Sequence, residues 1–140
     1  MIIANSDQYI RWNSSKAIYN FNSKNLDGAI LTFEAIHPKW SYAKCDKDGF
    51  VLEVAEKKVI SKNATVGVYY WKHGSDYVKS AEEMIKKNIR VNNEFYVCPV
   101  YNEFISKKKK VKIHNVEEMW GLGTPEAVSY THLRAHETYT

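Results

Sequence analysis

Three charged side chains follow two short apolar runs and could bind a phosphate-bearing ligand. Asp7 comes after the run at residues 1–4, and Glu56 and Lys57 come directly after the run at residues 50–55. Hard Mg²⁺ is usually bound by one or two carboxylates together with substrate phosphate oxygens, so Asp7 is a candidate metal ligand. A carboxylate beside an ammonium suits a polyol phosphate, because the carboxylate accepts from hydroxyls and the ammonium meets the phosphate. If both runs are strands that point the same way, these charges gather at one edge of a sheet.

Each of these residues also has a plain structural interpretation. Asp7 can cap a following helix, and charged residues at a strand end commonly just face solvent. Gly67 lies inside the apolar run "TVGVYY", where a missing side chain weakens packing unless a ligand or a backbone segment comes close. A β-bulge is the alternative explanation for this glycine. The residues by themselves leave these alternatives open.

The apolar runs that carry these residues predict strands. The run at residues 1–4 lacks polar alternation, which is typical of a parallel strand covered on both faces. The stretch "YAKCDKDGFVLEVA" predicts a hairpin whose turn lies at residues 46–49, where Asp-Gly supplies the favoured turn chemistry. The predicted strands are residues 1–4, 29–33, 42–45, 50–55 and 64–71, with a further strand in "KKKKVKIHNV".

Helices are predicted between these strands. Residues 12–22 carry apolar side chains at helical spacing, and a third helix is predicted over residues 94–105. Ser75 can cap the helix between them, which carries an apolar stripe that we interpret as core packing. The stripe consists of Tyr77, Val78, Ala81, Met84, Ile85 and Ile89.

The size and pattern of the chain indicate one domain with a mixed sheet. A chain of 140 residues with 44% hydrophobic content can bury one core but is short for two. Strands and helices are interspersed, so we expect an α/β fold, a three-layer α/β/α arrangement around a mixed sheet. The sequence contains no internal repeat and no transmembrane span.

Composition argues against several other classes of protein. The formal charge of +4 is matched by the run Lys107, Lys108, Lys109 and Lys110, which has no interleaved aromatic residues and therefore favours a solvated edge over nucleic-acid binding. Two cysteines, Cys45 and Cys98, are too few and too far apart for a zinc site. The N-terminus does not resemble a signal peptide, so we expect a cytoplasmic protein with reduced thiols and no membrane partner.

Five stretches occur in the order found in one enzyme family. "ANSDQ", "AEKK", "ATVGVYYW", "NNEFYVCPVYNEFI" and "MWGLGTPE" resemble the sugar-1-phosphate nucleotidyltransferases, also called nucleotide-sugar pyrophosphorylases, and most closely a bacterial subgroup of surface-polysaccharide pathways. The resemblance covers residues 1–127 and implies a Rossmann-like three-layer fold. It also implies transfer of a nucleotidyl group from a nucleoside triphosphate to a sugar 1-phosphate, with Mg²⁺ as cofactor and pyrophosphate as leaving group.

The resemblance assigns roles to individual residues. Asp7 matches the metal-binding acid of the family, and the pair Glu56 and Lys57 matches the residues that hold the sugar hydroxyls and the phosphate. Thr65, Val66 and Gly67 match the strand whose backbone lines the sugar pocket. The resemblance thus explains why the first strand stops on an acid: the charge of a triphosphate must be met at that edge.

The sequence departs from the family at two places. Gly121 stands where many relatives carry a second metal-binding Asp, and Glu117 or Glu118 just upstream are candidates to replace it. The Gly-rich phosphate loop of the family, with its catalytic Arg and following Lys, has no counterpart in this sequence, so the catalytic groups stay unknown. We therefore expect the chain to be the C-terminal portion of a nucleotidyltransferase domain, with its N-terminal part missing, and to be inactive by itself.

Residues 128–140 do not continue the family pattern. His132 and His136 stand four residues apart, but no third ligand accompanies them. We expect this tail to be non-native or disordered and to carry no function. The rival interpretations of the chain are a non-catalytic domain of the same fold that binds a nucleotide sugar, and a basic nucleic-acid module. The nucleotide base, the phosphate acceptor and the oligomeric state, including a homo-oligomer, stay open.

Overall fold

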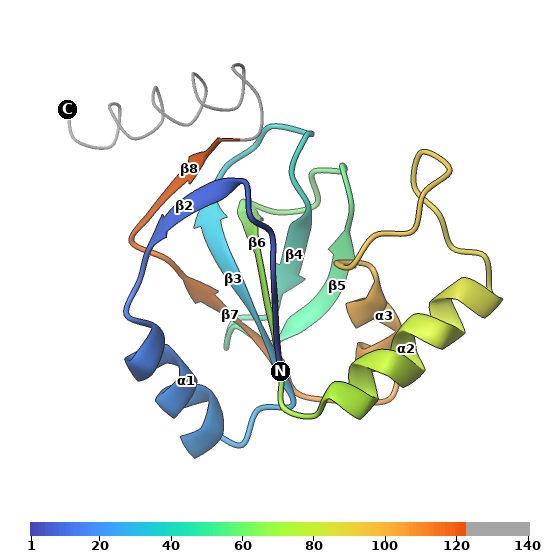
Figure 1. Ribbon diagram of the computed structural model, residues 1–140, viewed down its shortest axis with the longest axis horizontal. Helices are drawn as coiled ribbons and strands as arrows, with labels where there is room; N and C mark the ends of the chain where they lie inside the picture. Colours follow the sequence, from blue (N-terminus) through green and yellow to red (C-terminus); the bar gives the residue numbers. More distant parts are fainter. Residues whose placement is uncertain (123–140) are drawn as a thin grey trace.

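The computed structural model describes residues 1–122, which form strands and helices around one main sheet (Figure 1). In chain order the elements are β1 (Ile2–Ala4), β2 (Gln8–Arg11), α1 (Ser14–Ser23), β3 (Gly28–Glu34), β4 (Tyr42–Cys45), β5 (Val51–Ala55), β6 (Asn63–Trp71), α2 (Gly74–Lys86), α3 (Val100–Ile105), β7 (Val111–Asn115) and β8 (Glu118–Gly121). Within these residues, no helix is both long enough and apolar enough to cross a membrane.

The main sheet is mixed, as the interspersed pattern predicts. Five of its six strands follow the order β5-β4-β6-β3-β7, and the sixth, β1, pairs with β6. β3 and β7 run parallel, whereas the other pairs in this sheet are antiparallel. β2 and β8 form a separate antiparallel ribbon in which Gln8 lies opposite Gly121 and Arg11 lies opposite Glu118.

Helices cover both faces of the sheet, so the predicted α/β fold with three layers is confirmed (Figure 1). Alternation along β3 sends Ala29 and Leu31 toward α1, whereas Ile30 packs into the cluster that contains the buried residues of α2 and α3. The same alternation divides β6, where Tyr69 and Trp71 join the cluster on the α2 and α3 face. Strand periodicity thus explains how one sheet supports two cores.

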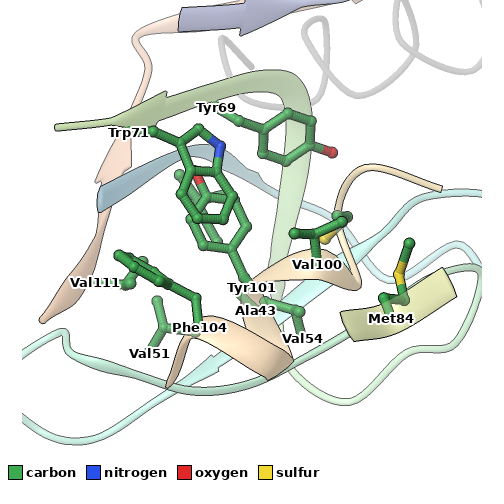
Figure 2. Packing of buried hydrophobic residues seen from close by; sticks show 12 residues of the cluster. Ala43, Val51, Val54, Tyr69, Trp71, Met84, Val100, Tyr101, Phe104 and Val111 are labelled. Atoms are coloured by element: carbon green, nitrogen blue, oxygen red, sulfur yellow. The ribbon is translucent and has the colours of Figure 1, made fainter. Parts of the chain in front are cut away.

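Aromatic rings dominate the core between the sheet and helices α2 and α3 (Figure 2). Trp71 stacks on Tyr101 with ring centroids 4.1 Å apart, and Phe104 packs against the same indole at 4.8 Å. The Tyr101 hydroxyl donates to the carbonyl of Tyr70 at 2.8 Å. Ring pairs of this kind contribute about 0.5–1.5 kcal/mol beyond the area they bury, so they fix α3 firmly against β6.

The first strand is not the buried parallel strand that its apolar run predicts. β1 pairs antiparallel with β6, with Ile3 opposite Tyr69. Ile2 and Ala4 are exposed, and only Ile3 packs against the core. A run of only a few apolar residues indicates a strand without showing how many of its faces the fold will cover.

The predicted hairpin is confirmed, but the helix predicted over residues 94–105 is only partly formed. Asp46 Oδ1 accepts from the backbone N–H groups of Asp48 at 2.9 Å and Phe50 at 3.0 Å and so closes the turn between β4 and β5. The helix predicted over residues 94–105 begins only at Val100, after Pro99. Proline disfavours helical geometry in the residue before it, which explains the late start.

The predictions for α2 are also corrected. The helix begins at Gly74 with His73 at the N-cap position, and no side chain caps it, so Ser75 lies inside the first turn. Its apolar stripe is only partly core packing. Met84 is buried and Tyr77 and Ala81 pack against the core, whereas three stripe residues are exposed, namely Val78, Ile85 and Ile89. The stripe is wider than the face that the sheet can cover.

Candidate functional site

A cavity of about 460 Å³ lies where β6 begins and where the segments after β1 and β5 approach it. The ribbon β2–β8 and the segment between α2 and α3 complete its wall. Residues of both charge types line it together with buried backbone of β6. The lining residues are Asn5, Asp7, Gln8, Lys39, Trp40, Ser41, Glu56, Thr65, Val66, Gly67, Tyr69, Phe95, Tyr96, Val97, Cys98, Met119 and Gly121.

Glu56 belongs to a hydrogen-bonded wall of this cavity. The hydroxyl of buried Ser41 donates to Glu56 Oε2, and the Ser41 carbonyl accepts from the Thr65 N–H at 2.8 Å. The hydroxyl of Thr65 lies 3.2 Å from that of Tyr69. Burial raises the pKa of Glu56, although the Ser41 hydrogen bond and nearby Lys57 both act to lower it. The carboxylate is thus held in place by the protein and still reaches the cavity.

Two neighbours of Glu56 are uncharged at neutral pH. Burial, together with the negative charge of Glu56, raises the pKa of the Cys98 thiol to about 12. Burial likewise raises the pKa of Tyr69 well above its ordinary value. Burial therefore disfavours a thiolate at Cys98, and this wall offers hydroxyl groups and one carboxylate to a polar ligand.

Lys57 lies next to the cavity but does not line it. Its ammonium donates to the Tyr96 hydroxyl at 2.9 Å and lies 5.0 Å from the centre of the Tyr96 ring. The hydrogen bond to Tyr96 raises the pKa of Lys57. Lys57 also has a positive φ of 56°, a left-handed conformation that a non-glycine residue adopts at a cost of about 1–2 kcal/mol. Of this pair, Glu56 lines the cavity and Lys57 lies beside it.

The strand residues Thr65, Val66 and Gly67 are buried and line the cavity, and Gly67 has a φ of +80°. The pairing of β3 with β6 shifts register at this point, as the bulge interpretation expects. The Asn5 N–H donates to the Gly67 carbonyl at 2.9 Å, and a Cβ at Gly67 would lie 2.9 Å from Asn5 Cγ. The glycine therefore admits the side chain of Asn5, a cavity residue that sequence reasoning missed.

Asp7 and Gly121 lie side by side on the wall that the β2–β8 ribbon forms. The Asp7 carbonyl accepts from the Leu122 N–H at 2.8 Å, and Gly121 pairs with Gln8 across the ribbon. Asp7 is exposed. Among residues 1–122, its carboxylate makes neither a hydrogen bond nor an ion pair. The structure thus places Asp7, Glu56 and the start of β6 around one cavity, while their roles as ligands stay predictions.

Glu117 and Glu118 do not substitute for an acid at position 121. Both pair with Arg11, at 3.3 Å and 3.4 Å from its Nε atom. Glu118 also accepts from the indole N–H of Trp120. Neither glutamate lines the cavity. Alternation along the ribbon explains this result, because Glu118 and Gly121 are three residues apart and face opposite sides.

The residues present fit a magnesium ion held mainly by its ligand. Within residues 1–122, no three His, Cys, Asp or Glu side chains gather in a way that could enclose a metal ion. Mg²⁺ commonly keeps waters and uses one or two carboxylates together with phosphate oxygens. Asp7, with a carboxylate that no other described residue uses, fits that role.

Sequence reasoning found the charged residues of the cavity wall more readily than its aromatic ones. The structure adds Trp40, Phe95 and Tyr96, and it adds Ser41 as the donor to Glu56. Trp40 packs edge-on against Phe33, and Phe95 is covered by the guanidinium of Arg90 at 4.3 Å. Adjacent aromatic residues in a segment without helical or strand periodicity were the available signal. The predicted helix over residues 94–105 concealed it.

Comparisons with known proteins identify solved structures with a similar fold. No protein-family model matches the chain, and no curated protein sequence matches it. Among solved structures, the chain is similar to the nucleoside-diphosphate-sugar pyrophosphorylase from Vibrio cholerae RC9, with a TM-score of 0.75 and 24% identity over 93% of this chain and 54% of that one. It is also similar to a protein from Bacillus anthracis described as a glucose-1-phosphate thymidylyltransferase, solved with a sucrose, with a TM-score of 0.69 and 14% identity over 98% of this chain and 55% of that one.

These likenesses establish an α/β fold shared with two nucleotidyltransferase structures. The chain spans about half the length of each of them. At 24% and 14% identity the likeness concerns the fold alone.

Proposed function

We propose that the cavity binds a sugar 1-phosphate and that the chain supplies the acceptor-binding part of a nucleotidyltransferase active site. The observation that carries this proposal is the single cavity that joins Asp7, Glu56 and the bulged start of β6. A protein-held carboxylate and buried hydroxyls match the hydroxyl groups of a sugar, and a neighbouring ammonium matches its phosphate. The two solved structures of similar fold carry names of this enzyme class.

The charged residues in and beside the cavity have distinct roles in such a reaction. Glu56, held by Ser41, accepts hydrogen bonds from sugar hydroxyls and fixes the sugar against β6. Lys57 offsets the charge of the sugar phosphate at the edge of the cavity. An oxygen of that phosphate then forms a bond to the α-phosphorus of a nucleoside triphosphate, while the bond to the departing pyrophosphate breaks. Asp7 would hold a bound Mg²⁺ in part, and the ion would neutralise charge on the phosphates.

The biological setting follows from the sequence resemblance. We infer a bacterial cytoplasmic enzyme that makes a nucleotide sugar for capsule or lipopolysaccharide synthesis. The substrates are a nucleoside triphosphate and a sugar 1-phosphate, with neither nucleic acid nor membrane as partner. Support comes from the five ordered stretches of sequence and from a cavity of a size that suits a phosphorylated sugar.

Binding of the acceptor can be tested on this chain directly. Isotope-labelled protein is titrated with the 1-phosphates of glucose, galactose, mannose and N-acetylglucosamine and followed by NMR. At least one should shift the resonances of Thr65, Val66 and Gly67. Glu56→Gln should weaken its binding about tenfold, because a charged acceptor is lost. Glu53→Gln, at an exposed residue of β5 three positions before Glu56, should leave the affinity within twofold.

Transfer is tested by pyrophosphate release with four nucleoside triphosphates, for this chain and for the product of the full reading frame that contains it. We expect release from the longer product and none from this chain. Binding of nucleotide sugars without release by either would favour the non-catalytic binding domain. A chain that binds no member of the sugar phosphate panel would overturn the proposal.

A further inference from the structure

The cation next to the cavity is held by a tyrosine that the catalytic proposal does not use. Lys57 Nζ donates to the Tyr96 hydroxyl at 2.9 Å and also lies over the Tyr96 ring, 5.0 Å from its centre. Tyr96 is half-buried and lines the cavity, whereas Lys57 is exposed and does not. Lys57 is therefore connected to the cavity wall by its hydrogen bond to Tyr96.

The segment that carries Tyr96 is braced by its own contacts. The backbone groups of Val91 and Glu94 donate to each other at 2.9 Å in both directions and close a tight turn. Arg90 Nε donates to Asn88 Oδ1 at 2.7 Å, and its guanidinium covers the ring of Phe95 at 4.3 Å. These contacts fix the backbone next to Tyr96. A lysine has four rotatable side-chain bonds, so a fixed acceptor is what restricts its ammonium.

We propose that Tyr96 is a positioning residue that holds the Lys57 ammonium at the cavity wall, so that the site distinguishes a phosphorylated sugar from the free sugar. This inference rests on the proposed sugar phosphate binding. The phenol accepts one N–H of the ammonium and leaves two for an anion. Because the charge is already in place, the phosphate binds without ordering a long side chain first.

The inference predicts a specific change in selectivity. The quantity to measure is the ratio of the dissociation constants for the free sugar and for its 1-phosphate, using the tightest member of the panel above and NMR titration. Tyr96→Phe keeps the ring and removes the acceptor, so the ratio should fall about three- to tenfold while binding of the free sugar stays within twofold. Tyr19→Phe, an exposed tyrosine on α1, serves as the matched control and should leave the ratio unchanged.

A double-mutant cycle separates positioning from a merely structural role. Lys57→Met should lower the ratio at least tenfold, and Tyr96→Phe introduced into Lys57→Met should have no further effect. A Tyr96→Phe effect that persists without the lysine would show that Tyr96 acts independently of Lys57 and would overturn the inference.

The outcomes also separate this inference from the proposed function. Wild-type binding of a sugar 1-phosphate with an unchanged ratio in Tyr96→Phe overturns the positioning role alone. The absence of binding by wild-type protein overturns both. Thermal unfolding of each variant identifies a loss of fold, and a Tyr96→Phe variant that unfolds is replaced by Tyr96→His, which should retain an intermediate ratio because its ring nitrogen accepts the same hydrogen bond.

Discussion

The two walls of the cavity differ in how firmly the protein holds their carboxylates. Glu56 is half-buried and accepts from Ser41, whose carbonyl is in turn bonded to β6. Asp7 is exposed, and within residues 1–122 no side chain or backbone donor pairs with its carboxylate. It lies at the start of a two-stranded ribbon, whereas Glu56 lies beside the six-stranded sheet.

This difference indicates which kind of ligand group each carboxylate is suited to bind. A carboxylate that the fold has already oriented can select the hydroxyl pattern of a sugar, because the ordering cost is met during folding. A carboxylate exposed to water keeps its full charge for a cation brought by a phosphate ligand. The Glu56 wall is therefore a recognition surface in the free protein, and the Asp7 wall is completed by what binds.

The largest effect on stability is expected at Gly67, where β6 contacts Asn5. Gly67→Ala places a Cβ 2.9 Å from Asn5 Cγ at a residue with a φ of +80°. We expect a loss of about 2–3 kcal/mol in the free energy of unfolding, from backbone strain and the displaced Asn5 side chain. Urea denaturation measures the loss.

Gly49→Ala is the matched control for this prediction. Gly49 has a φ of +86°, but a Cβ there would meet no atom within 4 Å. Its loss should therefore be near 1 kcal/mol, from strain alone. Asn5→Ala should bring the cost of Gly67→Ala down to that level. Equal costs at both glycines would show that Asn5 does not need the space at position 67.

Glu56 should make the free energy of unfolding depend on pH. Because burial raises the pKa of Glu56 above the value of 4.5 expected for an unfolded Glu, the folded protein holds the proton more tightly than the unfolded chain. The contribution of this group to stability is therefore greatest below the unfolded pKa and is lost as the pH rises through the folded pKa. Glu56→Gln removes this loss.

The variant should accordingly gain stability relative to wild type between pH 4 and pH 7, on the order of 0.5 kcal/mol after screening by solvent. Denaturation at a series of pH values measures the difference. Ser41→Ala in a protein that keeps Glu56 should increase the loss of stability with rising pH, since the Ser41 hydrogen bond lowers the pKa of Glu56. A difference between Glu56→Gln and wild type that is constant with pH would contradict the buried position of this acid.

The Asp7 wall should show the smallest effect on stability. Asp7→Asn should change the free energy of unfolding by less than about 0.5 kcal/mol, because the carboxylate stabilises nothing in the described fold. Asp27→Asn provides the contrast. Asp27 Oδ2 accepts from the Lys110 N–H at 2.8 Å, and its loss should cost about 1 kcal/mol.

Function should respond in the opposite order. In the full reading frame product, Asp7→Asn should remove most of the Mg²⁺-dependent turnover, and Asp27→Asn should leave turnover largely intact. Turnover of Asp7→Asn equal to that of wild type at saturating Mg²⁺ would exclude Asp7 as the metal ligand.

Local signals in the sequence correctly predicted the hairpin. The Asp-Gly turn placed β4 beside β5 because its geometry depends on adjacent residues only. Likewise the acids after β1 and β5 could be recognised from the apolar runs that they end. The predicted gathering of charges at one sheet edge assumed strands that point the same way, whereas β1 and β5 run in opposite directions. The helix predicted over residues 94–105 failed because the apolar spacing outweighed Pro99, and the ribbon of β2 with β8 was missed because its strands are more than a hundred residues apart.

The sequence by itself determined roughly where the strands of the main sheet lie, which turn closes the hairpin and which acids follow the apolar runs, since these depend on side-chain type and near neighbours. Only the tertiary structure decided that β1 runs antiparallel to β6, that Asn5 packs on Gly67 and that Tyr96 holds Lys57. Each of those contacts joins residues 39 or more positions apart in the chain. Which distant partners meet is set by the burial and hydrogen bonding of the whole sheet, and no local pattern encodes it.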